Sequence, residues 1–238
     1  MAADKPGAKV TADIKRNRLY ITLSCDPSKK VLEKVYTDVR FCVADLKPGF
    51  DVVTDLSQCT LGHLNGVATL RKIMNYLVIH QPGEVIRVTG KRSLLFKQLI
   101  RLSTKFRGYK PYYVTTLEEA ENKLAQPTRR SGLRFHLQRQ QLTYCVDREE
   151  SEGDLVDISI SGCKVKGKSG FPPLGKEITL TIPLLMDQND PVTFTITAKI
   201  TRVENDMFAA EFAGLDQERK HQLYKCLAYE ARRELPEE

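Results

Sequence analysis

The hydrophobic pattern of this chain changes period once, near residue 126, and that change limits the folds open to it. Before it, short runs with strand period, such as Leu19 to Leu23, alternate with amphipathic helical runs, such as Val31 to Leu46. Strands separated by helices pair in parallel through crossover connections, so this half predicts an α/β layered domain. From Arg134 onward the chain alternates at period two without intervening helices, which predicts an antiparallel barrel or sandwich.

These patterns give an expected order of elements. In the first half we expect strands at 19–23, 51–56, 84–89 and 112–115, and helices at 31–46, 64–78, 95–106 and from Thr116. In the second half we expect strands at 135–137, 142–146, 155–160, 164–165, 178–184, 192–203 and 207–212, then a closing helix at 217–234. Gln126-Pro127 breaks the helical pattern, so we predict an α/β domain at 12–124, a linker at 125–130 and a barrel domain at 131–238.

Length and composition fit two soluble domains. The chain has 238 residues, 41% of them hydrophobic and 28% charged, which is ordinary for globular proteins. No stretch reaches the roughly 18 consecutive apolar residues of a membrane span, and residues 1–10 lack the apolar core of a signal peptide. We therefore expect a cytoplasmic protein without membrane insertion.

The sequence gives little support to catalysis or to a metal site. Its six cysteines lie far apart without a CxxC pair, and we expect reduced, mostly buried thiols. There is no GxSxG, Walker A or HExxH motif, and the four histidines have no cysteine or carboxylate at metal or catalytic spacing. We predict no enzyme, no catalytic residue, no metal and no cofactor.

Positive charge is concentrated in the first half. Residues 1–126 carry 21 Lys and Arg against 12 Asp and Glu, a net charge of +9, which leaves −2 for the remainder of the total of +7. Together with Tyr109, Tyr112 and Tyr113, this surplus makes a nucleic-acid binder one alternative. Scattered lysines are more often a solvated surface, so we expect nucleic acid not to be the partner.

Two polar motifs open the second half. Arg130 and Arg134 form RxxxR, and Asp157, Ser159 and Gly162 form DxSxxG. Composition predicts about one RxxxR by chance but only about 0.05 occurrences of [DN]xSxxG, so the second motif carries the weight. In this order, at the start of a β-rich segment, the pair resembles the signature of the PilZ family.

The resemblance implies a bacterial receptor for the second messenger cyclic di-GMP, with a PilZ-type β-barrel. The ligand-binding residues would be Arg129, Arg130, Arg134, Asp157, Ser159 and Gly162. The planar guanidinium group suits phosphates and guanine edges, and Asp157 is an acceptor for guanine N–H donors. Arginines in the linker would close over the ligand, and binding would then be relayed as a change in domain arrangement or in partner binding.

A weaker resemblance covers the first half. The run from Asp55 to Gly66, which follows a strand and opens a helix, is similar to the corresponding turn of the STAS domains of anti-sigma-factor antagonists. Where that family has a phosphorylated serine, this chain has Asn65, which has no hydroxyl, and Ser57 is interpreted as a turn or cap residue. The resemblance implies an unphosphorylated protein-binding module, with a generic α/β scaffold as the alternative.

An adaptor function is a further alternative to the receptor function. A PilZ-like protein can lose its ligand and act only as an adaptor through protein contacts. The intact pair of motifs argues against this alternative. The sequence leaves the downstream partner, the number of ligands bound and the oligomeric state open.

Overall fold

The chain divides into two compact units in a computed structural model. One unit comprises residues 1–103 and 111–133, and the other comprises residues 104–110 and 134–238. The structure describes residues 7–24, 27–59, 67–90, 109, 111–126, 132–137, 140–168, 171–188 and 190–233. The expected helix at 95–106 lies outside the described residues.

The first unit is built on a five-stranded sheet in the order β1-β2-β3-β4-β5. Its strands are β1 (Ala8–Asp13), β2 (Arg18–Leu23), β3 (Asp51–Asp55), β4 (Val85–Val88) and β5 (Tyr112–Val114). Strands β2 to β5 pair in parallel, as predicted, whereas β1 forms an antiparallel hairpin with β2. Strand β1 was not predicted, because Val10 is the single β-branched residue among its alternating apolar residues Ala8, Val10 and Ala12, and the run contains no aromatic residue.

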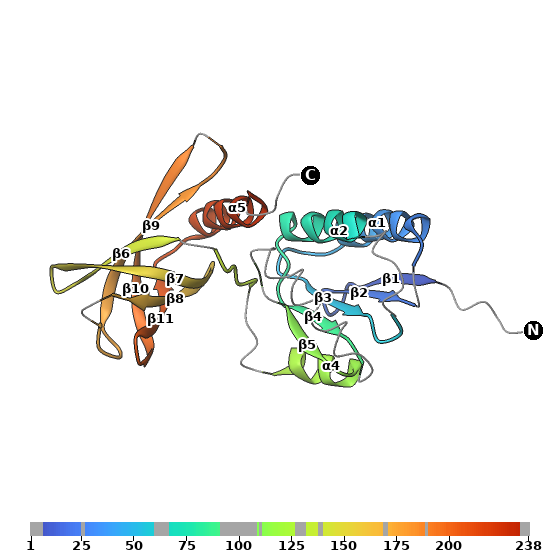
Figure 1. Cartoon of the computed structure of the whole chain (residues 1–238), viewed down its shortest axis with the longest axis horizontal. Coiled ribbons are helices and arrows are strands. Elements are labelled where there is room, and N and C mark those ends of the chain that lie inside the picture. The colour runs from blue at the N-terminus through green and yellow to red at the C-terminus, as the bar shows by residue number, and fades with distance from the viewer. Residues whose placement is uncertain are drawn as a thin grey trace, which may run out of the picture. The chain divides into compact units, whose positions relative to one another are not determined.

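Helices cover both faces of this sheet (Figure 1). Helices α1 (Lys29–Ala44) and α2 (Val67–Ile79) lie on one face, and α4 (Leu117–Ala125) lies on the other. Residues Val53, Ile86 and Val88 of the sheet form a buried cluster with Ala120 and Leu124 of α4. The predicted α/β layered architecture is therefore confirmed.

Local capping fixes where these helices begin. The Ser28 hydroxyl accepts from the Val31 amide at 3.3 Å at the start of α1. At α4 the Thr116 hydroxyl accepts from the Glu119 amide at 3.1 Å, and the Glu119 carboxylate accepts from the Thr115 amide at 2.6 Å. These bonds satisfy amides that have no partner within the helix. The helix expected from Thr116 is thus confirmed, with Thr116 as its N-cap.

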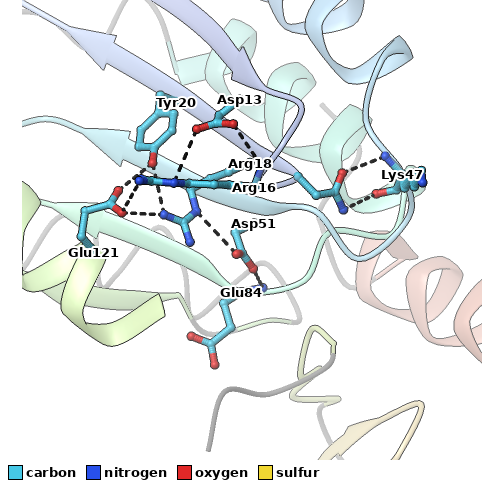
Figure 2. A network of polar contacts seen from close by, with 9 residues as sticks. Asp13, Arg16, Arg18, Tyr20, Lys47, Asp51, Glu84 and Glu121 are labelled. Atoms are coloured by element: carbon cyan, nitrogen blue, oxygen red, sulfur yellow. Dashed lines mark hydrogen bonds and ion pairs between the residues drawn. The ribbon is translucent and has the colours of Figure 1, made fainter. Parts of the chain in front are cut away.

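A charged network joins α4 to the sheet (Figure 2). The buried Arg18 side chain reaches the Glu121 carboxylate at 2.6 Å and lies 3.7 Å from the fully buried Asp51 carboxylate. The Tyr20 hydroxyl donates to the other Glu121 oxygen at 2.6 Å. Because α4 ends at Ala125, this network and the apolar cluster anchor the helix that directly precedes the predicted arginine linker.

The second unit is a closed antiparallel barrel in the order β10-β11-β8-β7-β6-β9. Its strands are β6 (Gln141–Val146), β7 (Glu149–Ser159), β8 (Gly162–Gly167), β9 (Glu177–Leu185), β10 (Pro191–Glu204) and β11 (Met207–Ala213). Alternate residues point inward, and Tyr144 and Phe208 meet there edge to face with ring centroids 5.1 Å apart. The predicted barrel is confirmed, although β7 begins six residues earlier than expected because its first half is charged and half exposed.

Helix α5 (Gln217–Arg233) packs against the barrel as the predicted closing helix. Its residues Leu223, Tyr224 and Leu227 are buried, and the Tyr224 ring meets Phe135 edge to face at 5.5 Å. The buried Glu230 carboxylate accepts from the Leu185 amide at 3.0 Å, which ties the helix to the end of β9.

The described part of the chain holds neither a membrane-spanning helix nor a metal-binding cluster. No helix there has the length and apolar character needed to cross a bilayer. Within those same residues no group of three or more His, Cys, Asp or Glu side chains is arranged to hold a metal ion.

The ion pairs of Glu121 predict a pH-dependent loss of stability. Burial opposes ionisation of Glu121, but the hydrogen bond from Tyr20 and the Arg18 charge outweigh it and lower the pKa of Glu121. A lowered folded-state pKa stabilises the fold above the unfolded-state value, and that stability is lost as pH falls through the folded value. We expect Glu121→Gln to lower the free energy of unfolding at pH 7 by about 0.5–1 kcal/mol, a figure discounted for its 38% exposed side chain.

The measurement is urea unfolding followed by circular dichroism at several pH values. The difference between wild type and variant should shrink as pH falls from the unfolded-state pKa of Glu121, about 4.3, through its lowered folded-state pKa, because the carboxyl group is then protonated in both states. Glu118→Gln, in the exposed first turn of the same helix, is the matched control. A Glu121→Gln effect that did not change with pH would contradict this assignment.

Candidate ligand-binding site

The segment before the barrel lies along the edge of β7. The Phe135 amide donates to the Ile158 carbonyl at 2.8 Å, and the Ile158 amide donates to the Phe135 carbonyl at 3.0 Å. Both side chains are fully buried. Because side chains alternate along an extended backbone, the neighbours Arg134, Asp157 and Ser159 take the opposite direction from Phe135 and Ile158.

A β-bulge helps to set the position of Asp157. The register between β7 and β8 shifts between Leu155 and Asp157, so Val156 is an extra residue in β7. The Val156 carbonyl accepts from His136 Nδ1 at 3.1 Å, which holds the bulge to the segment that carries Arg134. Bulges bend a strand and redirect the side chains next to them.

Arg134 and Asp157 form an ion pair on the outside of the barrel. Arg134 Nη1 donates to Asp157 Oδ1 at 2.5 Å, and the two side chains are 30% and 14% exposed. The pair joins two segments that lie 23 positions apart in the sequence. It leaves Arg134 with further N–H donors and Asp157 with a second carboxylate oxygen.

Ser159 stabilises the hairpin turn between β7 and β8. Its hydroxyl donates to the Gly162 carbonyl at 3.2 Å and accepts from the Ser161 amide at 3.3 Å. The residue is buried, so its hydroxyl serves the turn between β7 and β8 in this structure. A direct contact of Ser159 with a ligand stays a prediction.

Gly162 lies where two strands come close together. A Cβ added at this position would overlap the carbonyl oxygen of Ala210 in β11. Only glycine avoids that overlap, so the glycine of the motif is required by strand packing as well as by any ligand.

The buried thiol below the ion pair is not a nucleophile. Cys163 points into the barrel opposite Ile158, and burial first, with the nearby Asp157 charge second, raises the pKa of its thiol to about 12. A thiol with so high a pKa stays protonated at neutral pH and is inert. All five described cysteines are free thiols.

The structure thus brings together Arg134, Asp157, Ser159 and Gly162 of the predicted site. They converge around the β7–β8 hairpin within the second unit. Arg129 and Arg130 lie outside the described residues, as does Asn65 of the first unit. Ser57 is a turn residue as interpreted, because its amide donates to Asp55 Oδ1 at 2.9 Å.

Tyr109 is a residue near the site that sequence reasoning missed. It forms an antiparallel bridge with Phe135 on the side away from Ile158, and it is buried. The sequence had placed it in the first domain, whereas Tyr109 groups with the barrel unit. No local pattern marks this contact, because Tyr109 belongs by sequence to the strand and helix alternation of the first half.

A family model identifies the second unit. Residues 128–229 match the model of the PilZ domain. This segment is a PilZ domain. The match spans Arg129, Arg130 and all the motif residues described above, so the PilZ resemblance noted in the sequence is confirmed.

Solved structures resemble each part of the chain. The PilZ domain of YcgR from Escherichia coli with c-di-GMP has 14% identity and a TM-score of 0.35, covering 42% of this chain and 90% of that one. The PlzA protein of Borreliella burgdorferi in complex with c-di-GMP has 10% identity and a TM-score of 0.31, covering 48% and 46%. The unphosphorylated anti-sigma factor antagonist SpoIIAA has 12% identity and a TM-score of 0.35, covering 48% and 94%. No curated protein matches the chain.

Gly162 gives a direct test of the packing of the PilZ domain. We expect Gly162→Ala to lower the free energy of unfolding by about 1–3 kcal/mol, because β8 and β11 must move apart to admit the methyl group. Differential scanning calorimetry measures this as a lower melting temperature. Gly7→Ala is the control, since its Cβ would make only ordinary contacts with Val31 at 3.8 Å. Equal melting temperatures for wild type and Gly162→Ala would show that the strands are not packed this closely.

Proposed function

We propose that this chain is a receptor for cyclic di-GMP, which binds to the outside of its PilZ domain. The observation that carries the proposal is the pairing of Arg134 with Asp157, one residue from each of the two motifs, at 2.5 Å on the barrel surface. Motif residues from distant parts of a sequence meet in this way when they serve one site.

The chemistry of the pair suits a guanine base. An arginine binds the O6 and N7 acceptors of guanine with two parallel hydrogen bonds, and a carboxylate accepts from the N1–H and N2–H donors. Arg134 has donors to spare after its bond to Asp157, and the second Asp157 oxygen has no hydrogen bond among the described residues. The ion pair therefore positions a donor group and an acceptor group next to each other before any ligand arrives.

The remaining predicted residues complete the site. Arg129 and Arg130 lie outside the described residues and would supply guanidinium groups for the phosphates. Ser159 and Gly162 would act mainly by holding the β7–β8 hairpin, which carries Asp157. A binding protein of this kind needs neither a metal nor a cofactor, and we assign it no catalytic step.

Tyr109 provides a route for relaying ligand binding. Phe135 lies between Tyr109 and Ile158 and directly follows Arg134. A ligand that orders Arg134 would stabilise the backbone of Phe135, and with it the bridge to Tyr109. Tyr109 lies three residues before β5 of the α/β unit. A change in the order of Tyr109 would therefore be passed along the backbone to the start of β5. We infer that the relay acts through this connection on domain arrangement or on a protein partner of the α/β unit.

Binding affinity tests the receptor directly. We expect cyclic di-GMP to bind the wild type at micromolar concentration or tighter in calorimetric titration. Arg130→Ala, Arg134→Ala and Asp157→Ala should each weaken binding by about tenfold or more, because a hydrogen bond to a charged group contributes about 1.5–3 kcal/mol.

The matched control for lost charge is Arg40→Ala, on an exposed position of α1 in the other unit. It should bind like the wild type, and GTP should bind none of the variants. A wild-type protein that ignores cyclic di-GMP at 100-fold the expected concentration, or an Arg134→Ala variant of full affinity, would refute the proposed site.

Hydrogen exchange tests the relay. Saturating cyclic di-GMP should slow amide exchange in peptides that contain Tyr109 and Phe135, because both lie on the bridge next to Arg134. Peptides from β9 and β10 should change little and serve as the internal control. Ligand-dependent protection confined to β7 and β8, with no change at Tyr109, would rule out this route.

A further inference from the structure

The outer face of the barrel carries a row of side chains next to the Arg134–Asp157 pair. Asp157 of β7 is opposite Lys164 of β8, Lys164 is opposite Ala209 of β11, and Ala209 is opposite Arg202 of β10. Residues directly opposite in antiparallel strands have Cβ atoms about 4.5–5.5 Å apart on one face. Lys164 is therefore the nearest cross-strand neighbour of Asp157, and small Ala209 follows it.

Lys164 differs from the other outward lysine of the same strand. The Lys164 side chain is 20% exposed, whereas the Lys166 side chain is 56% exposed. Within the described ranges each lysine has one carboxylate partner, at 3.5 Å for Lys164 and Glu204 and at 3.2 Å for Lys166 and Asp206. The ion pair of Lys164 is thus longer than that of Lys166. The Lys164 side chain is also the more buried of the two.

The negative charge of Glu204 is balanced by a second cation besides Lys164. Its other oxygen, Oε1, lies 3.3 Å from Arg202 Nε. If the Lys164 ammonium turned toward a ligand, Glu204 would keep a cation beside it. The cost of changing partners is small, because the Glu204 side chain is 47% exposed and ion pairs at the surface contribute only about 0–1 kcal/mol.

The charges in this row favour an anion. Arg134, Lys164 and Arg202 carry three positive charges against the two carboxylates of Asp157 and Glu204, which leaves one net positive charge. The Arg134–Asp157 pair is already neutral and suits a base edge. The ammonium of lysine is a compact point charge that suits a phosphate oxygen.

From this arrangement we propose that Lys164 binds one phosphodiester group of the cyclic dinucleotide whose guanine is held by Arg134 and Asp157. The inference rests on the proposed receptor function and adds a binding residue outside both motifs. On binding, the Lys164 ammonium leaves Glu204 for the phosphate, and Glu204 stays paired with Arg202.

The test compares Lys164→Ala with Lys166→Ala by calorimetric titration with cyclic di-GMP. Both variants remove one outward positive charge from β8, so a general charge effect would be equal in the two. We expect Lys164→Ala to weaken binding about tenfold and Lys166→Ala less than about twofold. Removing a phosphate contact should also make the affinity of Lys164→Ala alone less sensitive to salt, because one charge–charge attraction that salt screens is gone.

Glu204→Ala separates a ligand contact from a structural role. If Lys164 binds the ligand, this variant frees the lysine and should bind as tightly as the wild type or tighter. If Lys164 acts only by bracing β8 against Glu204, both Lys164→Ala and Glu204→Ala should weaken binding, and that result would overturn the inference.

The wild-type titration separates failure of this inference from failure of the receptor function. Full affinity in Lys164→Ala, with wild type binding normally, would overturn the role of Lys164 and leave the receptor intact. Absence of binding by the wild type would overturn both.

Discussion

Two backbone hydrogen bonds between Phe135 and Ile158 are the interaction on which the candidate site depends. They attach the segment before the barrel to β7, with both apolar side chains buried. Because neighbours along an extended backbone point the opposite way, the same two bonds bring Arg134 beside Asp157. The ion pair is therefore a consequence of backbone pairing, and the pairing is stabilised by burial of Phe135 against Tyr224 of α5.

Arg18 and Arg134 both form ion pairs, but they differ in burial and therefore in role. Arg18 is buried between Glu121 and Asp51, with Tyr20 bonded to the same glutamate. Removing one member of such a buried network leaves a charge uncompensated, so these residues hold α4 to the sheet. Arg134 and Asp157 are partly exposed and form a single pair. The spare N–H donors of Arg134 and the second Asp157 oxygen stay available to a ligand while the pair remains closed.

Much of the architecture was predictable because it follows from local pattern. Hydrophobic period and cap residues in the sequence predict the parallel strands β2 to β5, the capped helix α4 and the closing helix α5. Strand β1 did not, because its stability comes from pairing with β2 rather than from its own composition. The early part of β7 was missed for a related reason, since four of its residues, Glu149, Glu150, Glu152 and Asp154, are charged, yet the barrel pairs them with β6.

The sequence by itself determined that the chain has an α/β half and a barrel half, and that two polar motifs open the barrel segment. Both follow from information carried within a short window, namely side-chain period and residue spacing. Only the tertiary structure decided that Ser159 serves the hairpin, that Lys164 stands next to Asp157, and that Tyr109 belongs with the barrel. Those facts depend on strand register and on contacts between residues far apart in the chain. Neither can be predicted from the order of neighbouring amino acids.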